Sequence, residues 1–169
     1  MTLSWSHAFV NVKNLKRMVS FYTDALGFRI SDQTEGIAFL SQLDDEHHQI
    51  AFKEDANQGN EPSRVGHFAF RVDSLDEVKN LYTELSANED AGKVVPITHG
   101  NTWSIYFHDP ERNGIEVFCD TPWDAVQPLA EPWDPKMSRV ELEKYTKDLI
   151  SQHGDLKANP REHVEFGRV

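Results

Sequence analysis

Cysteine is almost absent from the chain, which has 169 residues and a single cysteine, Cys119. No internal disulfide can form, so a reducing cytoplasm is the expected location. No apolar run is long enough to cross a bilayer, and the first ten residues have neither the basic nor the apolar segment of a secretion signal. Basic residues are also scarce, because 17 Lys and Arg against 28 Asp and Glu give a net charge of -11. Nucleic acids and anionic membranes are therefore not expected as partners.

What the chain does contain is an internal repeat. HAFVNVKNLKRMVSFYTDALG, which starts at His7, aligns without a gap with HFAFRVDSLDEVKNLYTELSA, which starts at His67. Each copy opens with a short strand and continues into a helix with apolar residues at i, i+3, i+4 and i+7. Three strand-like runs follow each helix, at about 27–32, 36–42 and 48–53 in the first copy and at about 93–97, 102–108 and 114–120 in the second.

This pattern predicts an α+β fold in which residues 1–120 form two βαβββ modules, at about 5–55 and 64–120. The polar linker QGNEPSR separates the modules. We expect the modules to pair into a half-open barrel that encloses a cavity, with the helices outside.

Residues 121–169 have a different composition and predict a C-terminal extension. Its first part is rich in Pro and Trp, and an amphipathic helix is expected over about 138–152, behind a capping box of Ser138 and Glu141. No chemistry is recognisable here, so packing, an oligomer contact and a lid all remain open. The predicted packing face of the helix consists of Val140, Leu142, Tyr145, Leu149 and Ile150.

Strand parity singles out His7, His67 and Glu116. Alternate residues of a strand point to opposite faces, and the apolar face of each strand must meet the helix. The three polar side chains therefore point into the predicted cavity. The residues expected on the helix side are Ala8, Val10 and Val12 in the first strand, Phe68, Phe70 and Val72 in the strand after His67, and Ile115, Val117 and Cys119 in the last strand.

These three residues form a candidate metal site. A carboxylate buried without a partner would cost several kcal/mol, and a divalent metal shared with two imidazoles removes that cost. Two His and one carboxylate also leave open coordination positions, as in non-heme Fe(II) oxygenases. Alternatively, each His is an ordinary hydrogen-bonded strand residue, and Glu116 pairs with Arg71.

The segments HAFVNV, GHFAFRV and IYFHDPERNGIEVF resemble the vicinal oxygen chelate superfamily of glyoxalases, bleomycin resistance proteins and extradiol dioxygenases. The resemblance covers roughly residues 5–120, and within the superfamily it points to the one-domain type I extradiol catechol dioxygenases. It implies the paired βαβββ fold and a metal held by His7, His67 and Glu116. Fe(II) is the expected ion, with Mn(II) as the alternative.

The resemblance also implies three catalytic residues. His48 resembles the acid-base residue that takes a proton from the catechol, while His99 and Tyr106 resemble the residues that hold the metal-bound substrate oxygens. Other roles stay open: His48 as a turn residue or a fourth metal ligand, His99 as a surface loop residue, and Tyr106 as a core residue. The chain has Thr98 where an arginine is usual before the His-Gly pair, which leaves recognition of the substrate's side chain undefined.

The function implied is that of an Fe(II)-dependent extradiol ring-cleaving dioxygenase in aromatic compound catabolism, which uses O2 to open a catechol-like diol. A glyoxalase-type isomerase and a fosfomycin-type transferase of the same superfamily are alternatives. A non-catalytic small-molecule binding protein is a third. The family also leads us to expect a homo-oligomer, a dimer or larger.

Overall fold

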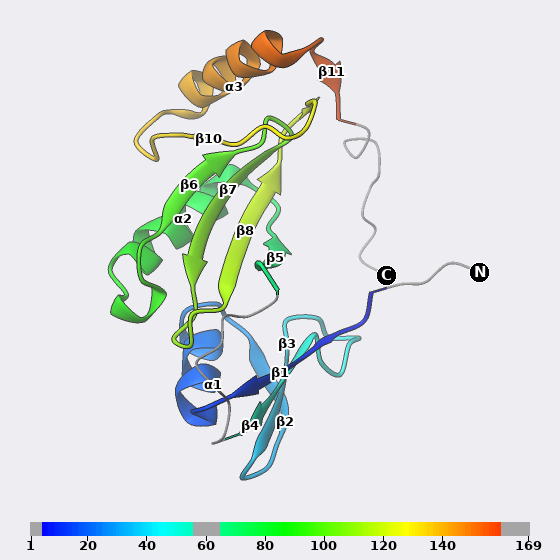
Figure 1. The fold of residues 1–169 in the computed structure, drawn as a ribbon, viewed down its shortest axis with the longest axis vertical. Helices are drawn as coiled ribbons and strands as arrows, with labels where there is room; N and C mark the ends of the chain where they lie inside the picture. The colour runs from blue at the N-terminus through cyan, green and yellow to red at the C-terminus, as the bar shows by residue number, and fades with distance from the viewer. Residues whose placement is uncertain (1–4, 56–64, 160–169) are drawn as a thin grey trace, which may run out of the picture. The chain divides into compact units, whose positions relative to one another are not determined.

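A computed structural model describes residues 5–55 and 65–159 (Figure 1). The chain divides into two compact units, of which unit 1 comprises residues 1–66 with 109–113, and unit 2 comprises residues 67–108 with 114–169. The predicted linker QGNEPSR lies outside the described residues. The predicted pairing of the modules into a half-open barrel stays a prediction.

Unit 1 is a four-stranded sheet with one helix. Its strands occur in the order β1-β4-β3-β2, and β1 runs parallel to β4. Helix α1 begins where the Asn14 side chain accepts a hydrogen bond from the Arg17 N–H. The elements are β1 (Ala8–Val12), α1 (Leu15–Asp24), β2 (Arg29–Gln33), β3 (Ile37–Ser41) and β4 (Ile50–Glu54).

Unit 2 repeats this topology. The strands of its βαβββ module have the order β5-β8-β7-β6, which corresponds to β1-β4-β3-β2 of unit 1. Strand β5 runs parallel to β8, as β1 does to β4. The predicted internal repeat is therefore confirmed in the way the strands pair. The elements are β5 (Phe68–Arg71), α2 (Leu75–Ser86), the 3-10 turn η1 (Glu89–Ala91), β6 (Val95–Thr98), β7 (Thr102–His108) and β8 (Gly114–Asp120).

The C-terminal extension belongs to unit 2 and adds one strand to its sheet. Strand β10 pairs antiparallel with β6 at the edge of that sheet, while β11 and β9 form a separate two-stranded antiparallel sheet. The capping box of Ser138 and Glu141 is present at the start of α3, but Val140 is 75% exposed, so its place in the predicted packing face was wrong. The elements are β9 (Trp123–Asp124), β10 (Glu131–Pro132), α3 (Arg139–His153) and β11 (Lys157–Ala158).

The alternation of buried and more exposed residues confirms the predicted strand parity. In β8, Ile115, Val117 and Cys119 are buried, and in β7 the buried residues include Ile105 and Phe107. The other face of both strands is therefore available for polar side chains. Within the described part of the chain, no helix has the length and apolarity needed to cross a membrane.

The tip of the β7–β8 hairpin, residues 109–113, forms part of unit 1. The Tyr22 hydroxyl donates to Asp109 at 3.3 Å, and burial raises the pKa of both groups. The Glu111 carboxylate accepts hydrogen bonds from the main-chain N–H groups of Lys13 and Asn14, each at 2.8 Å. These bonds tie the hairpin tip to the start of α1.

Candidate metal centre and substrate site

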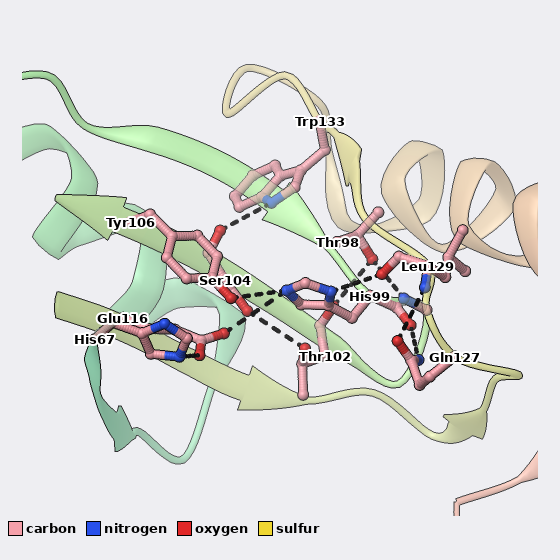
Figure 2. Close-up of polar contacts among 11 residues, drawn as sticks. His67, Thr98, His99, Thr102, Ser104, Tyr106, Glu116, Gln127, Leu129 and Trp133 are labelled. Carbon is pink, nitrogen blue, oxygen red and sulfur yellow. Dashed lines mark hydrogen bonds and ion pairs between the residues drawn. The ribbon is translucent and has the colours of Figure 1, made fainter. Parts of the chain in front are cut away.

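Glu116 lies on β8 between two neighbouring strands. In the pairing register it stands opposite Tyr106 of β7 on one side and Ala69 of β5 on the other. His67, directly before β5, has its Nε2 atom 3.1 Å from Oε2 of Glu116 (Figure 2). Strand pairing thus brings together two of the three predicted metal ligands within unit 2.

The Glu116 carboxylate is buried, with 8% of the residue exposed, and its neighbours are imidazoles. Its Oε1 lies 3.9 Å from Nε2 of His99, while Oε2 faces His67. Arg71 forms an ion pair with Asp120, at 3.0 Å.

The spacing of His67 and Glu116 suits a shared metal ion. Two ligand atoms each about 2.1 Å from an ion, at roughly a right angle, lie about 3 Å apart. The observed separation is 3.1 Å. His7 belongs to unit 1, and within residues 5–55 and 65–159 no three His, Cys, Asp or Glu side chains form a metal-binding group. The three-ligand set stays a prediction, with two of its members in contact.

His99 has hydrogen bonds at both ring nitrogens. Its Nδ1 lies 2.6 Å from the main-chain oxygen of Leu129, and its Nε2 lies 2.8 Å from the Tyr106 hydroxyl (Figure 2). A carbonyl oxygen can only accept, so Nδ1 carries the proton. In the neutral ring Nε2 is then an acceptor, and the Tyr106 hydroxyl donates to it.

Tyr106 is held in its protonated form. Burial is the largest cause that raises its pKa, and the neighbouring Glu116 carboxylate raises it further, because a tyrosinate beside a carboxylate would be repelled. The predicted alternative, a purely apolar core residue, does not describe this side chain, whose hydroxyl bonds His99. Tyr106 is therefore available as a hydrogen-bond donor at neutral pH.

The loop that carries His99 is braced by its own hydroxyl groups. The buried Thr98 donates to the main-chain oxygen of Thr102 at 3.0 Å and accepts from the Gly100 N–H at 3.1 Å. Thr121, which follows β8, donates to the Gly100 oxygen at 2.6 Å. The Thr98 hydroxyl thus helps to build the turn.

The remaining two predicted residues, His7 and His48, lie together in unit 1. Their ring centroids are 4.4 Å apart, and His48 also packs edge-on against Phe39 at 5.0 Å. Burial lowers the pKa of His48, and the nearby His7 and His47 lower it further, since a second positive charge would be repelled. The neutral form of His48, which can accept a proton, is therefore favoured.

The two modules differ at the carboxylate position. In unit 2, Glu116 stands opposite Ala69, whereas in unit 1 the corresponding pair is Ala51 and Phe9. The repeat thus supplies one histidine in each copy, His7 and His67, but a carboxylate only in the second.

Sequence reasoning missed the part of the site that comes from the extension. The partner of His99 is the Leu129 main-chain oxygen, and the Gln127 amide donates to the main-chain oxygen of His99 at 2.8 Å. A main-chain oxygen is present in every residue, so the sequence does not show which one accepts a hydrogen bond. The one available hint was Gly100, because a glycine can be required where another segment packs against the backbone.

Comparison with known proteins agrees with this fold. Residues 4–117 match the Glyoxalase/Bleomycin resistance protein/Dioxygenase superfamily, and the chain belongs to that family. Among solved structures, the fosfomycin resistance protein FosX from Listeria monocytogenes, complexed with Mn(II) and sulfate, is similar with a TM-score of 0.55. The two proteins are 22% identical, and the match covers 72% of this chain and 95% of that one.

Two curated relatives are dioxygenases from Rhodococcus globerulus. Biphenyl-2,3-diol 1,2-dioxygenase 3 is 29% identical over 150 residues, covering 86% of this chain and 74% of the relative. Biphenyl-2,3-diol 1,2-dioxygenase 2 is 28% identical over 170 residues, covering 90% of this chain and 88% of the relative. Similarity to these proteins supports a dioxygenase within the superfamily.

Proposed function

We propose that this protein is an Fe(II)-dependent extradiol dioxygenase that opens the ring of a catechol-like diol with O2. The observation that carries the proposal is the cluster in unit 2, where His67 contacts Glu116 and His99 contacts Tyr106 beside the same carboxylate. The similarity to dioxygenases that act on biphenyl-2,3-diol points to the same class of substrate.

The metal would be held by His67 and Glu116 of unit 2 and by His7 of unit 1. Support for His7 comes from its equivalence to His67 in the repeat, since each precedes the first strand of its module. When bound, Fe(II) supplies adjacent positions for the diol and O2 and a path for electrons between them. Mn(II) remains the alternative ion for the same ligands.

The remaining residues would handle protons and orient the diol. His48, whose pKa is lowered, would accept a catechol proton at neutral pH. Tyr106, whose pKa is raised, would donate a hydrogen bond to a substrate oxygen as negative charge builds there. His99 would hold the same end of the diol through its Nε2 side.

Metal analysis and oxygen uptake test the proposal together. Protein purified without oxygen is expected to bind about one iron per chain, since structural and catalytic metal sites of this kind hold a single ion. It should consume O2 when catechol or biphenyl-2,3-diol is added. Metal binding without oxygen uptake on either diol would reject the dioxygenase assignment and leave the metal centre standing.

Ligand variants test the site itself. His67→Ala and Glu116→Ala should each lose tight iron binding, because the loss of one protein ligand of three leaves too few donors. His153→Ala is the matched control, because His153 is an exposed histidine at the end of α3. Parental iron content in both ligand variants would contradict the assignment of these residues.

A further inference from the structure

The C-terminal extension makes direct hydrogen bonds to His99. The main-chain oxygen of Leu129 accepts the Nδ1 proton of the ring at 2.6 Å, and the Gln127 amide donates to the main-chain oxygen of His99 at 2.8 Å. Both partners lie in the segment between β9 and β10 (Figure 2). The extension therefore makes hydrogen bonds to both the ring and the main chain of His99, a proposed substrate-binding residue.

We propose that this segment of the extension is part of the substrate site and that Gln127 and the Leu129 carbonyl position His99. By accepting the Nδ1 proton, the carbonyl selects the ring tautomer whose Nε2 is an acceptor directed at Tyr106. What His99 then does to a substrate rests on the proposed function. The selection of the tautomer does not.

Gln127 sets the position of the carbonyl relative to the ring. Its amide nitrogen donates to the His99 oxygen at 2.8 Å, while its amide oxygen accepts from the Leu129 N–H at 3.0 Å. One side chain thus bridges the residue that carries the ring and the residue that carries the acceptor. Gln127 is exposed, so the bridge is not a by-product of core packing.

Gly100 shows how closely the extension approaches the loop. Its φ is +79°, and a Cβ at this position would lie 2.6 Å from Cβ of Ala125, 3.0 Å from Cδ2 of Leu129 and 3.1 Å from Cγ1 of Ile150. Those three residues form a buried cluster of the extension. Any side chain at Gly100 would push this cluster, and the Leu129 carbonyl with it, away from His99.

Two variants disturb the contact by different routes. Gln127→Glu keeps an oxygen to accept from the Leu129 N–H but loses the donor to His99. Gly100→Ala introduces the clash with the extension. Its matched control is Gly92→Ala, because Gly92 also has a positive φ, +63°, but nothing lies within 4 Å of an added Cβ. The control carries the backbone strain without displacing the extension.

The first readout is the tautomer of His99, from ring nitrogen chemical shifts of the full-length protein with metal removed by a chelator, at mildly alkaline pH. The parent and Gly92→Ala should show a proton on Nδ1 and a bare Nε2. Gln127→Glu and Gly100→Ala should show a mixture of both tautomers. A parent with the proton on Nε2, or two variants with parental shifts, would overturn the proposal.

The second readout is kcat/KM for catechol with iron-loaded protein. A positioning group beside a site residue typically contributes about 10–100-fold, so both variants should fall in that range with iron content unchanged. Adding Ala125→Gly to Gly100→Ala removes the shortest clash and should restore part of the loss. If the parent consumes no O2, the proposed function fails while the tautomer result stands. If the parent is active and both variants keep parental kcat/KM, the positioning role is wrong.

Discussion

Replacing Tyr106 with phenylalanine removes one hydroxyl group and leaves the aromatic ring in place. In the parent this hydroxyl donates to Nε2 of His99 at 2.8 Å, and its pKa is raised by burial and by Glu116. The variant therefore tests whether the hydroxyl serves catalysis or only supports the fold. The two roles predict losses of different size.

The expected loss of stability is small. Nε2 of His99 would lose its donor, and a fully buried acceptor left without a partner costs about 1–3 kcal/mol. The His99 side chain is 25% exposed, however, so water can take the place of the hydroxyl. We expect the free energy of unfolding to fall by about 1 kcal/mol, at the lower end of that range.

The expected loss of activity is larger. A donor aimed at an oxygen that gains negative charge contributes about 10²–10³-fold in turnover, which corresponds to about 2.7–4 kcal/mol. Water in the same place is not fixed in orientation and would not restore this contribution. Tyr106→Phe should therefore lose more in activation free energy than in folding free energy, by roughly 2 kcal/mol or more.

Urea unfolding, iron content and oxygen uptake with catechol measure these losses separately. Tyr145→Phe is the matched control, because the Tyr145 hydroxyl also donates a hydrogen bond within unit 2, to the main-chain oxygen of Pro132 at 2.9 Å. The control should lose a little stability and no turnover. Parental turnover in Tyr106→Phe would refute the catalytic role, and loss of iron would instead make Tyr106 a support for Glu116.

Three further predictions concern other parts of the chain. Thr146→Val removes the acceptor of the buried Trp103 indole N–H, a bond of 2.9 Å, so urea unfolding should show a loss of about 1–3 kcal/mol, whereas Thr146→Ser should stay near the parent. His48→Asn should keep its iron while turnover falls by roughly 10²–10⁴-fold, the usual range for a proton-transfer group. Loss of iron together with turnover would make His48 a metal ligand. Unchanged iron content and unchanged turnover would make it a turn residue. Because burial raises the pKa of Tyr22 and of Tyr106, the unfolded chain loses these two protons first as pH rises above about 10. The free energy of unfolding should then fall as pH rises, and Tyr106→Phe should weaken that dependence; an equal dependence in parent and variant would contradict it.

Periodicity was enough to predict the repeated core of the fold. In the runs 102–108 and 114–120 an apolar residue recurs at every second position, and they are observed as Thr102–His108 and Gly114–Asp120. Strands of two residues, such as β9 and β10, were not predicted, because they exist through the partner they pair with rather than through their own pattern. The place of Val140 was wrong for a different reason: it lies two residues before Leu142, about 200° around the helix, and so points away from the buried Leu142, Thr146 and Ile150.

The candidate site, like the fold, could be predicted from the sequence only in part. Parity predicted that Glu116 points away from the apolar face of its strand, and the register places it directly opposite Tyr106. The hydrogen bond between His99 and Leu129 could not be predicted from the sequence, because it joins residues 30 positions apart and its acceptor is a main-chain oxygen. The membership of residues 109–113 in unit 1 could not be predicted either, since it depends on Glu111 reaching main-chain donors far away in the sequence.

The two modules place titratable side chains in opposite environments on the same pattern of strands. In unit 1, burial and neighbouring histidines lower the pKa of His48 and favour a neutral acceptor. In unit 2, burial and Glu116 raise the pKa of Tyr106 and favour a donor. A reaction that needs both a base and a hydrogen-bond donor requires two environments that move the pKa values of the two groups apart. Burial is the largest cause of the raised pKa of Tyr106, and the Glu116 carboxylate, whose counterpart in unit 1 is Ala51, adds to it. The charge that would bind a metal therefore also favours the protonated form of Tyr106.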